Sequence, residues 1–414
     1  MRLPWLLLLA AAALAQDFSH RGFLETRVLL YPQIASNDSG RAVAEGLFRY
    51  EAAYKARPWF RLAGAFDART DSHRQTAREW DLEWQDRGRQ RPAFAVRRLS
   101  AILNRKSLTA EVGKQFIRWG KADVLNPTDR FAPRDFLSVV DNDFLGVTAA
   151  RLTWEATTSD TLDLVWQPRF TPSRIPLLNQ RWVLAPAGAE GIPFLDAGAH
   201  FPGRSQFGAR WNHVGGGFEH SLSFFEGFNH LPLFDGRAVP VVPPEAGGPP
   251  FAIEFRRFYP KMRMYGADAA VPLRWFTVKG EAAYFTSSTQ QADQYLQYVV
   301  QLERQTGEWV FVGGYAGEKV TEKRVVQDFA PDRGLARALL GRASYTIDVN
   351  RRFAFEGAVR QNGDGVWLKF EYSQAVGQHW RATASVTVIR GEPGDFLGQY
   401  RRNSHGIGVM RYSF

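Results

Sequence analysis

Charged side chains recur at alternate positions in many segments of this chain, opposite an apolar face. In an extended segment, Arg49 and Glu51 lie on one face. Their neighbours Phe48 and Tyr50 lie on the other. Such rows can form paired charges that stabilise a wet interior, or a track of arginines that selects anions. Both interpretations stay open. The residues expected to line this interior are Arg49, Glu51, Arg61, Glu111, Gln115, Arg151, Arg210, Glu281, Arg342, Glu356, Arg360, Lys369 and Arg381.

Other residue types give little support for catalysis. Cysteine is absent, which excludes thiol catalysis, thiolate metal sites and disulfides. No histidine pair has a metal-binding spacing, and no serine lies in a nucleophile-elbow motif. Ser221 follows His220, but neighbours on a strand point to opposite faces and cannot form a dyad. We therefore expect no enzyme and no cofactor; the alternative is a hydrolase site assembled from distant loops.

A short acidic segment offers the one candidate for a metal. Asp141, Asn142 and Asp143 could supply oxygen ligands to calcium. The segment lacks the glycine and the distal glutamate of the helix-loop-helix calcium motif. We expect a solvated loop here and no metal site.

The elements that must position these side chains are long strands. Alternation of apolar and polar residues recurs almost throughout, in runs of about 9–13 residues, the length that crosses a bilayer at a tilt. Soluble β-sandwich strands average only about 5–6 residues. We predict an all-β, antiparallel, up-and-down transmembrane barrel of about 18 strands, with 16 as the alternative. The expected spans are 20–31, 42–56, 58–69, 92–103, 107–119, 145–157, 160–169, 205–214, 217–228, 261–272, 274–287, 296–306, 308–319, 336–348, 352–361, 365–374, 379–390 and 404–414.

The connections between these strands alternate between short turns and mostly long loops, as in bacterial barrels. The long loops are 70–91, 120–144, 170–204, 229–260, 320–335 and 391–403. The loop 120–144 is long enough to fold inward and narrow a pore. Pro240–Pro250 is rich in proline and glycine and is expected to be part of an irregular external loop.

The two ends of the chain predict an exported protein. Residues 1–15 have the basic start, apolar run and Ala13-Leu14-Ala15 site of a cleaved signal peptide, so residues 16–414 form the expected barrel domain. The final strand carries Met410, Tyr412 and Phe414 on one face. A terminal aromatic of this kind is expected to serve as a signal to the barrel-assembly machinery.

The segment after residue 112 carries a family resemblance. Gly113-Lys114-Gln115 leads into Trp119-Gly120, and Asn126-Pro127-Thr128-Asp129 follows. In this pattern the chain resembles bacterial outer-membrane porins related to the alginate-export porins, including a domain-of-unknown-function branch linked to resistance-nodulation-division transporters. The basic position is Lys114 here rather than arginine. Further similar segments are 168–176, 265–270 and 280–285.

The resemblance and the strand pattern together suggest a function. We expect an outer-membrane channel of a Gram-negative-type bacterium that passes a small or polymeric, and in one version anionic, solute through a charged lumen narrowed by inward loops. The alternative is an export outlet for polysaccharide or lipid-like cargo, working with a periplasmic or inner-membrane transporter. The candidates in the pore loop are Trp119, Asn126, Asp129, Arg130 and Arg134.

One position does not fit the predicted strand. If Glu111, Gly113 and Gln115 face the lumen, Lys114 faces lipid, at a cost of a few kcal/mol near mid-bilayer. A bulge or a different facing would remove this conflict.

The chain is basic, with a formal net charge of +10. Such a protein could bind anionic solutes or the phosphates of lipopolysaccharide. The expected partners are therefore outer-membrane lipid and lipopolysaccharide, and not nucleic acid, because no basic-aromatic binding module stands out.

Overall fold

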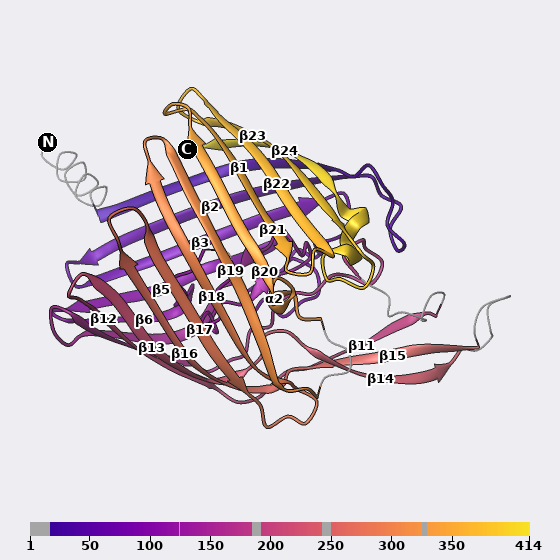
Figure 1. The fold of residues 1–414 in the computed structure, drawn as a ribbon, viewed down its shortest axis with the longest axis horizontal. Coiled ribbons are helices and arrows are strands. Elements are labelled where there is room, and N and C mark those ends of the chain that lie inside the picture. The colour runs from indigo at the N-terminus through magenta and orange to yellow at the C-terminus, as the bar shows by residue number, and fades with distance from the viewer. Residues whose placement is uncertain (1–16, 124, 184–191, 242–249, 325–328) are drawn as a thin grey trace, which may run out of the picture.

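The fold is a closed wall of antiparallel strands around a partly filled interior (Figure 1). The computed structural model describes residues 17–123, 125–183, 192–241, 250–324 and 329–414. The predicted signal peptide, 1–15, lies outside the described residues. Within them, no helix is long and apolar enough to cross a membrane.

The wall contains 18 strands, which confirms the predicted fold class and excludes the 16-strand alternative. All pair with their sequence neighbours, and β1 pairs with β24 to close the ring. In order, they are β1 (Phe18–Leu30), β2 (Ala42–Arg57), β3 (Phe60–Asp71), β5 (Phe94–Arg105), β6 (Leu108–Gln115), β9 (Val147–Glu155), β10 (Asp160–Gln167), β12 (Gln206–Gly215), β13 (Phe218–Phe228), β16 (Lys261–Pro272), β17 (Thr277–Thr286), β18 (Gln294–Thr306), β19 (Trp309–Glu322), β20 (Ala338–Thr346), β21 (Arg351–Arg360), β22 (Gly365–Val376), β23 (Trp380–Gly391) and β24 (His405–Ser413).

The two ends of the barrel differ in their connections. At one end, called the turn end below, short links such as 58–59, 216–217 and 377–379 join the strands. At the other, the loop end, most links are long, as the sequence predicted. Gly216, Gly307 and Gly377 have positive φ values in these turns, a conformation that glycine adopts without steric cost.

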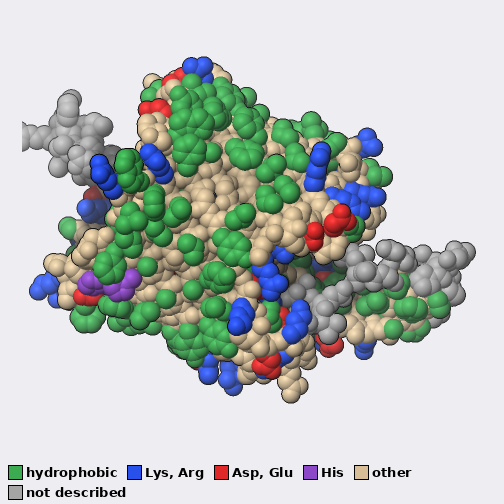
Figure 2. Space-filling view, viewed as in Figure 1, with side chains coloured by type: hydrophobic (Ala, Val, Ile, Leu, Met, Phe, Trp, Pro, Cys, Tyr) green, Lys and Arg blue, Asp and Glu red, His purple; other side chains and the backbone are tan. Residues whose placement is uncertain are grey.

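The outer surface is apolar over much of the wall. Leu24, Leu222, Tyr265, Val300 and Leu339 are all exposed, and by strand alternation they point outward. Figure 2 shows such hydrophobic side chains spread over the wall, whereas many of the Lys and Arg side chains lie toward the edges of this face. This pattern fits a wall surrounded by lipid.

Several smaller elements lie outside the predicted strands. A three-stranded sheet of β11 (Phe194–His200), β15 (Phe251–Phe258) and β14 (Leu233–Pro240) projects from the loop end (Figure 1). Of the segment Pro240–Pro250, predicted to be part of an irregular external loop, Pro240 ends β14, Val241 and Pro250 lie outside the strands, and 242–249 lie outside the described residues. Short pieces inside or above the barrel are β4 (Leu82–Glu83), β7 (Arg134–Asp135), β8 (Asp143–Phe144), α2 (Pro331–Gly334) and η1 (Gly398–Asn403).

Candidate pore

The loop between β6 and β9, residues 116–146, folds into the barrel and is called the pore loop below. Its first half lies against β16 to β18. There Glu281 on β17 accepts hydrogen bonds from the backbone N–H groups of Lys121 (3.0 Å), Ala122 (3.2 Å) and Thr128 (2.8 Å). The Thr128 hydroxyl donates a fourth, at 2.8 Å. The carboxylate of Glu281 thus holds the first half of the pore loop against the barrel wall.

The predicted pore-loop residues anchor this segment. Asp129 accepts hydrogen bonds from the backbone N–H groups of Trp119 (2.5 Å) and Gly120 (2.7 Å). The Trp119 ring packs edge-on against Phe131, and its Nε1 donates to Asp163 on β10 at 2.9 Å. The Asn126 side chain bonds the carbonyl oxygen of Ala122. These residues are buried and hold the loop, and Asn126 and Asp129 also border an open space beside β19 to β22.

The tip of the pore loop reaches the opposite wall. Asp141 pairs with Arg27 on β1 at 2.8 Å, and Asp143 pairs with Arg97 on β5 at 2.9 Å. Because both carboxylates of the suggested calcium segment are held by arginines, this geometry does not resemble a cation site. Burial alone would raise the pKa of Asp141, but Arg27 and Lys369 outweigh it and keep that pKa below its usual value.

Further loops cross the loop end above the pore loop. Arg174 on the loop after β10 donates to Asp86 (2.5 Å) and to Asp135 of the pore loop (3.2 Å). Arg91 pairs with Asp135 at 2.9 Å. Burial alone would raise the pKa of Asp135, but Arg91 and Arg174 outweigh it and hold that pKa well below its usual range. This cluster ties three separate loops together inside the barrel.

Lys114 belongs to the same cluster, which corrects the expectation that it faces lipid. Gly113 has φ +126°, and this turns the strand so that the Lys114 side chain is only 1% exposed. Its Nζ lies 2.5 Å from Asp86 and 2.7 Å from the carbonyl oxygen of Trp84. The strand also ends at Gln115 instead of 119, and β4 pairs with the part of β5 beyond it.

Three connected spaces remain between the loops and the wall. The β1–β5 chamber is lined by β1, β2, β3 and β5; the β19–β22 chamber by β19 to β22; and the β21–β24 chamber by β21 to β24 and β1. Asp141 at the tip of the pore loop borders all three. Asp141 therefore lies where the three chambers approach one another.

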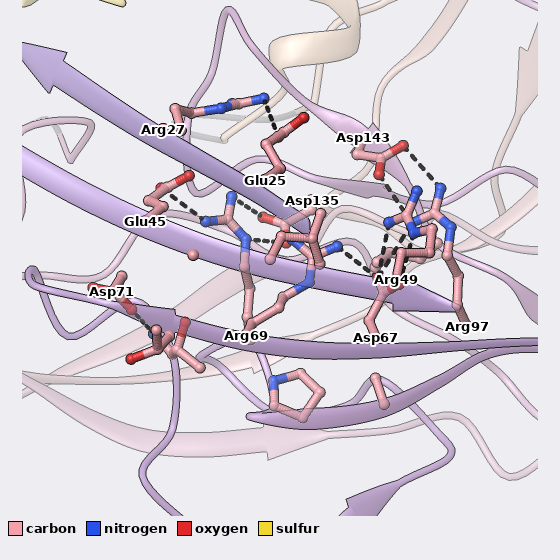
Figure 3. A pocket seen from close by; sticks show the side chains of 18 of the residues that line it. Glu25, Arg27, Glu45, Arg49, Asp67, Arg69, Asp71, Arg97, Asp135 and Asp143 are labelled. Carbon is pink, nitrogen blue, oxygen red and sulfur yellow. Dashed lines mark hydrogen bonds and ion pairs between the residues drawn. The ribbon is translucent and has the colours of Figure 1, made fainter. Parts of the chain in front are cut away.

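The cations of the β1–β5 chamber are occupied by carboxylates (Figure 3). Arg49 makes a two-point contact with Asp67, at 2.7 and 2.8 Å, and Arg69 donates to the same carboxylate at 2.8 Å. Arg411 pairs with Glu25 and lies over the Phe23 ring. This chamber is a lattice of satisfied ion pairs, which matches the interpretation of a stabilised wet interior.

The wall on the other side of Asp141 is different. Arg342 in the β19–β22 chamber and Arg352 in the β21–β24 chamber have no ion pair among the described residues. Arg381 donates to the hydroxyl of Ser373 at 3.1 Å, and not to a carboxylate. Lys369 lies between Glu356 (4.0 Å) and Glu371 (3.6 Å).

Of the predicted pore-loop cations, Arg130 and Arg134 line the β19–β22 chamber: Arg130 lies 3.6 Å from Asp332, and Arg134 donates to the side-chain oxygen of Asn142 at 3.0 Å and not to a carboxylate. Among the described residues, the cations of these two chambers that have no carboxylate partner therefore lie on β20, β21 and β23 and at Arg134 of the pore loop.

Some of the predicted pore-lining residues line the chambers, some are covered by loops, and the others are paired with another charged side chain or are exposed. Arg49, Arg342, Glu356, Lys369 and Arg381 line the chambers. Gln115, Arg210 and Glu281 face the interior but are covered by loops, and Arg151 pairs with Asp163 at 2.8 Å. Arg360 pairs with Asp395 at 2.9 Å. Glu51 pairs with Arg21 and Glu111 with Arg98, and Arg61 is exposed near the turn end.

Sequence reasoning missed several residues that border the chambers. Arg27, Asp67 and Arg97 lie on predicted strands, and their alternation with apolar neighbours could have found the first two. Arg97 follows a register shift between β3 and β5, which no periodic pattern shows. Ser221 contacts Asp268 and Asn212, whereas His220 lies on the other face beside Phe218.

Comparison with known proteins identifies a family for this chain. Residues 64–327 match the family described as "Protein of unknown function (DUF1302)". The chain belongs to this family. None of the curated proteins matches the sequence. A relation to the alginate-export porins stays a prediction.

Several solved structures have a similar fold. A BenF-like porin from Pseudomonas fluorescens Pf-5 is similar with a TM-score of 0.55 and 8% identity, over 96% of this chain and 98% of that one. Acinetobacter baumannii OccAB4 gives 0.56 and 9%, over 96% and 98%. Pseudomonas aeruginosa OccK2 (OpdF), solved in complex with glucuronate, gives 0.54 and 8%, over 96% of each chain. At such identities the likeness shows the fold alone.

Proposed function

We propose that this DUF1302 protein is an outer-membrane diffusion channel that favours small anionic solutes. The observation that carries this proposal is the division of charge around Asp141. On one side the arginines are bound by carboxylates, and on the other Arg342, Arg352 and Arg381 are open to the chambers. A row of such cations attracts anions and lowers the barrier to their entry. The porin fold of OccK2 and the other similar structures supports the location and the class of function.

The route needs no covalent chemistry. A carboxylate solute in the β21–β24 chamber would meet Arg381 and the hydroxyls of Ser373, Thr383 and Ser385, which can donate hydrogen bonds to it. It would then pass Lys369 toward Arg342 while Asp141 repels it from the paired wall. The solute is thereby guided along β20 to β23.

The export alternative finds less support. The β1–β24 pairing runs from Phe23–Ser413 to Leu30–Gly406, and so the described strands close the wall where the chain ends meet. The chambers are lined by many charged side chains instead of a continuous apolar surface. Lipid-like cargo would require an opening in the wall and a continuous apolar lining. A transporter partner stays a prediction from the resemblance.

The test is a reversal-potential measurement in planar bilayers. The triple variant Arg342→Glu, Arg352→Glu, Arg381→Glu should shift the preference from anions to cations. The matched control is Arg274→Glu, Arg304→Glu, since both side chains stack on Trp275 on the outside of the turn end. Glucuronate should carry current or block chloride current in the parent protein, whereas neutral glucose should not. A folded parent protein without conductance would refute the proposal.

A further inference from the structure

The outward-facing side chains change from aromatic to charged near the loop end of β13 and β16. Along these paired strands, Phe224 lies opposite Tyr265, with ring centroids 5.4 Å apart. Two residues closer to the loop end, Glu226 lies opposite Arg263. Alternation keeps all four side chains on the same, outward face. An aromatic row that would lie at the lipid interface is thus followed directly by a charged row.

A hollow lies at this height, between the ends of β12, β13, β16 and β17. Its cations are Arg204, Lys261 and Arg263, and its carboxylate is Glu226. Glu226 pairs with Arg263 at 3.2 Å. Arg204 and Lys261 have no ion pair among the described residues, so the hollow has a net positive charge. Ser205, Thr286 and Ser288 add hydroxyl groups to the same lining.

The edge of the hollow is held in place by the chain itself. The Ser287 hydroxyl donates to the carbonyl oxygen of Lys261 at 2.6 Å, and Arg324 donates to the Ser287 carbonyl oxygen at 3.0 Å. Arg324 is in turn paired with Glu322 at 2.7 Å. The cations therefore project from a fixed rim.

We propose that this hollow binds the phosphate groups of an anionic glycolipid headgroup in the outer leaflet. Cations and hydroxyl donors are the groups that bind phosphate. The exposed rings of Phe207, which lies opposite Glu226, and of Tyr265 and Tyr284 just below offer contact to acyl chains. Basic residues near a membrane surface attract anionic headgroups, and each cation adds to the affinity. The inference rests on the proposed outer-membrane location, but not on ion conduction.

The turn end provides a contrast. Its outward cations Arg274 and Arg304 stack on the face of Trp275, at 5.1 and 5.6 Å from the ring centroid. They line none of the hollows described above. Charge reversal there alters the number of outward cations in the same way while leaving the proposed site intact.

The experiment measures lipid binding to the full detergent-purified barrel by native mass spectrometry. The probes are bisphosphorylated lipid A and the same lipid with its phosphates removed. The parent barrel should prefer the phosphorylated form by roughly tenfold or more. Arg204→Glu, Lys261→Glu, Arg263→Glu should abolish this preference, whereas Arg274→Glu, Arg304→Glu should keep it. Equal binding of both lipids by the parent barrel, or an unchanged preference in the triple variant, would overturn the inference.

A second variant and a competition with inorganic phosphate complete the experiment. If the triple variant does not fold, Arg204→Gln, Lys261→Gln retains the Arg263–Glu226 pair and should still reduce the preference severalfold. Displacement of lipid A by millimolar inorganic phosphate would identify a site for free anions and refute the glycolipid assignment. Conductance recorded from the same preparations tests the channel separately, because loss of conductance with retained lipid preference contradicts only the proposed function.

Discussion

At the scale of single residues, the buried charges inside the barrel are the most sensitive positions. Lys114 and Arg174 are 1% and 3% exposed, and both pair with Asp86. A buried ion pair gives little net stabilisation, but removing one member leaves a charge without a partner in a poorly solvated site. Asp86 is therefore important for holding the inward loops together, because its loss would leave two buried cations without this partner.

Asp86→Asn should detach the inward loops. The substitution leaves the Lys114 ammonium and the Arg174 guanidinium facing a neutral amide, which we expect to cost about 3–5 kcal/mol. The measurement is the temperature at which the folded barrel converts to its unfolded form on electrophoresis. Asp348→Asn is the control, because Asp348 pairs with Arg351 in an exposed turn. Equal unfolding temperatures for the two variants would argue against a role of the cluster in stability.

The same carboxylates determine how acid affects the loops. Burial alone would raise the pKa of Asp86, but Arg174 and Lys114 outweigh it and lower that pKa, as Arg91 and Arg174 do for Asp135. A carboxylate with a lowered folded pKa contributes its full stabilisation above the unfolded value, about 3.9, and loses it as the pH falls through the folded value.

The part of the unfolding temperature that these carboxylates contribute should therefore be lost only below about pH 4, whereas His230, whose pKa burial lowers to about 4, makes stability fall from about pH 6.5 downward. Asp86→Asn should flatten the decrease below about pH 4, because one of the two carboxylates is gone. A difference between the acid profiles of the parent and Asp86→Asn that develops between about pH 6.5 and 4.5, where His230 titrates in the unfolded chain, would contradict this account.

At the scale of elements, the pore loop depends on one wall residue. Oε1 of Glu281 accepts from the N–H and hydroxyl of Thr128, and Oε2 accepts from the N–H groups of Lys121 and Ala122. A glutamine has only one accepting oxygen, so one of these pairs of donors loses its acceptor. Each unsatisfied buried donor costs about 1–3 kcal/mol.

Glu281→Gln should loosen the first half of the pore loop and make single-channel current larger or noisier. Glu254→Gln is the matched control, since Glu254 pairs with Arg237 at 2.6 Å in the three-stranded sheet outside the barrel and is not bonded to the pore loop. Recording both variants at the same voltage separates the two effects. Identical traces for the two variants would show that the loop does not limit the current.

The strands were predictable, whereas the loops that shape the interior were not. Each strand has a side-chain period of two, and Arg381, Thr383 and Ser385 alternate visibly with Ala382 and Ala384. The pore loop has no period, and its position depends on contacts such as Asp123 N–H to Gln301 that join residues far apart in sequence. Only its length indicated that it could fold inward.

Lys114 is a position where side chains do not alternate between the two faces of the strand. The alternation rule assumes regular backbone, and the positive φ of Gly113 breaks it one residue earlier. The glycine is visible in the sequence, but its conformation depends on how closely it approaches Leu99 and Ser100 of β5. One sign of this irregular backbone was visible in the sequence, a lysine at a position expected to face lipid, and the irregularity does lie there.

At the scale of the whole molecule, the net charge does not describe the pore. The chain carries a formal charge of +10, yet acidic and basic side chains are equal in number around the three chambers together. The β21–β24 chamber alone has more basic than acidic residues. Selectivity must therefore arise from where charges lie, and not from their sum.

Salt should consequently remove most of the anion preference of the parent channel. Screening acts over about 10 Å in 0.1 M salt and about 3 Å in 1 M salt. A solute that senses Arg342, Arg352 and Arg381 at low salt should scarcely sense them at high salt unless it touches them. The ratio of chloride to potassium permeability should approach one at 1 M, while block by glucuronate, which depends on direct hydrogen bonds, should weaken less. A permeability ratio that does not change with salt would indicate that contact at a narrow passage selects the ion, and would shift the origin of selectivity from β20–β23 to the Asp141–Arg27 pair.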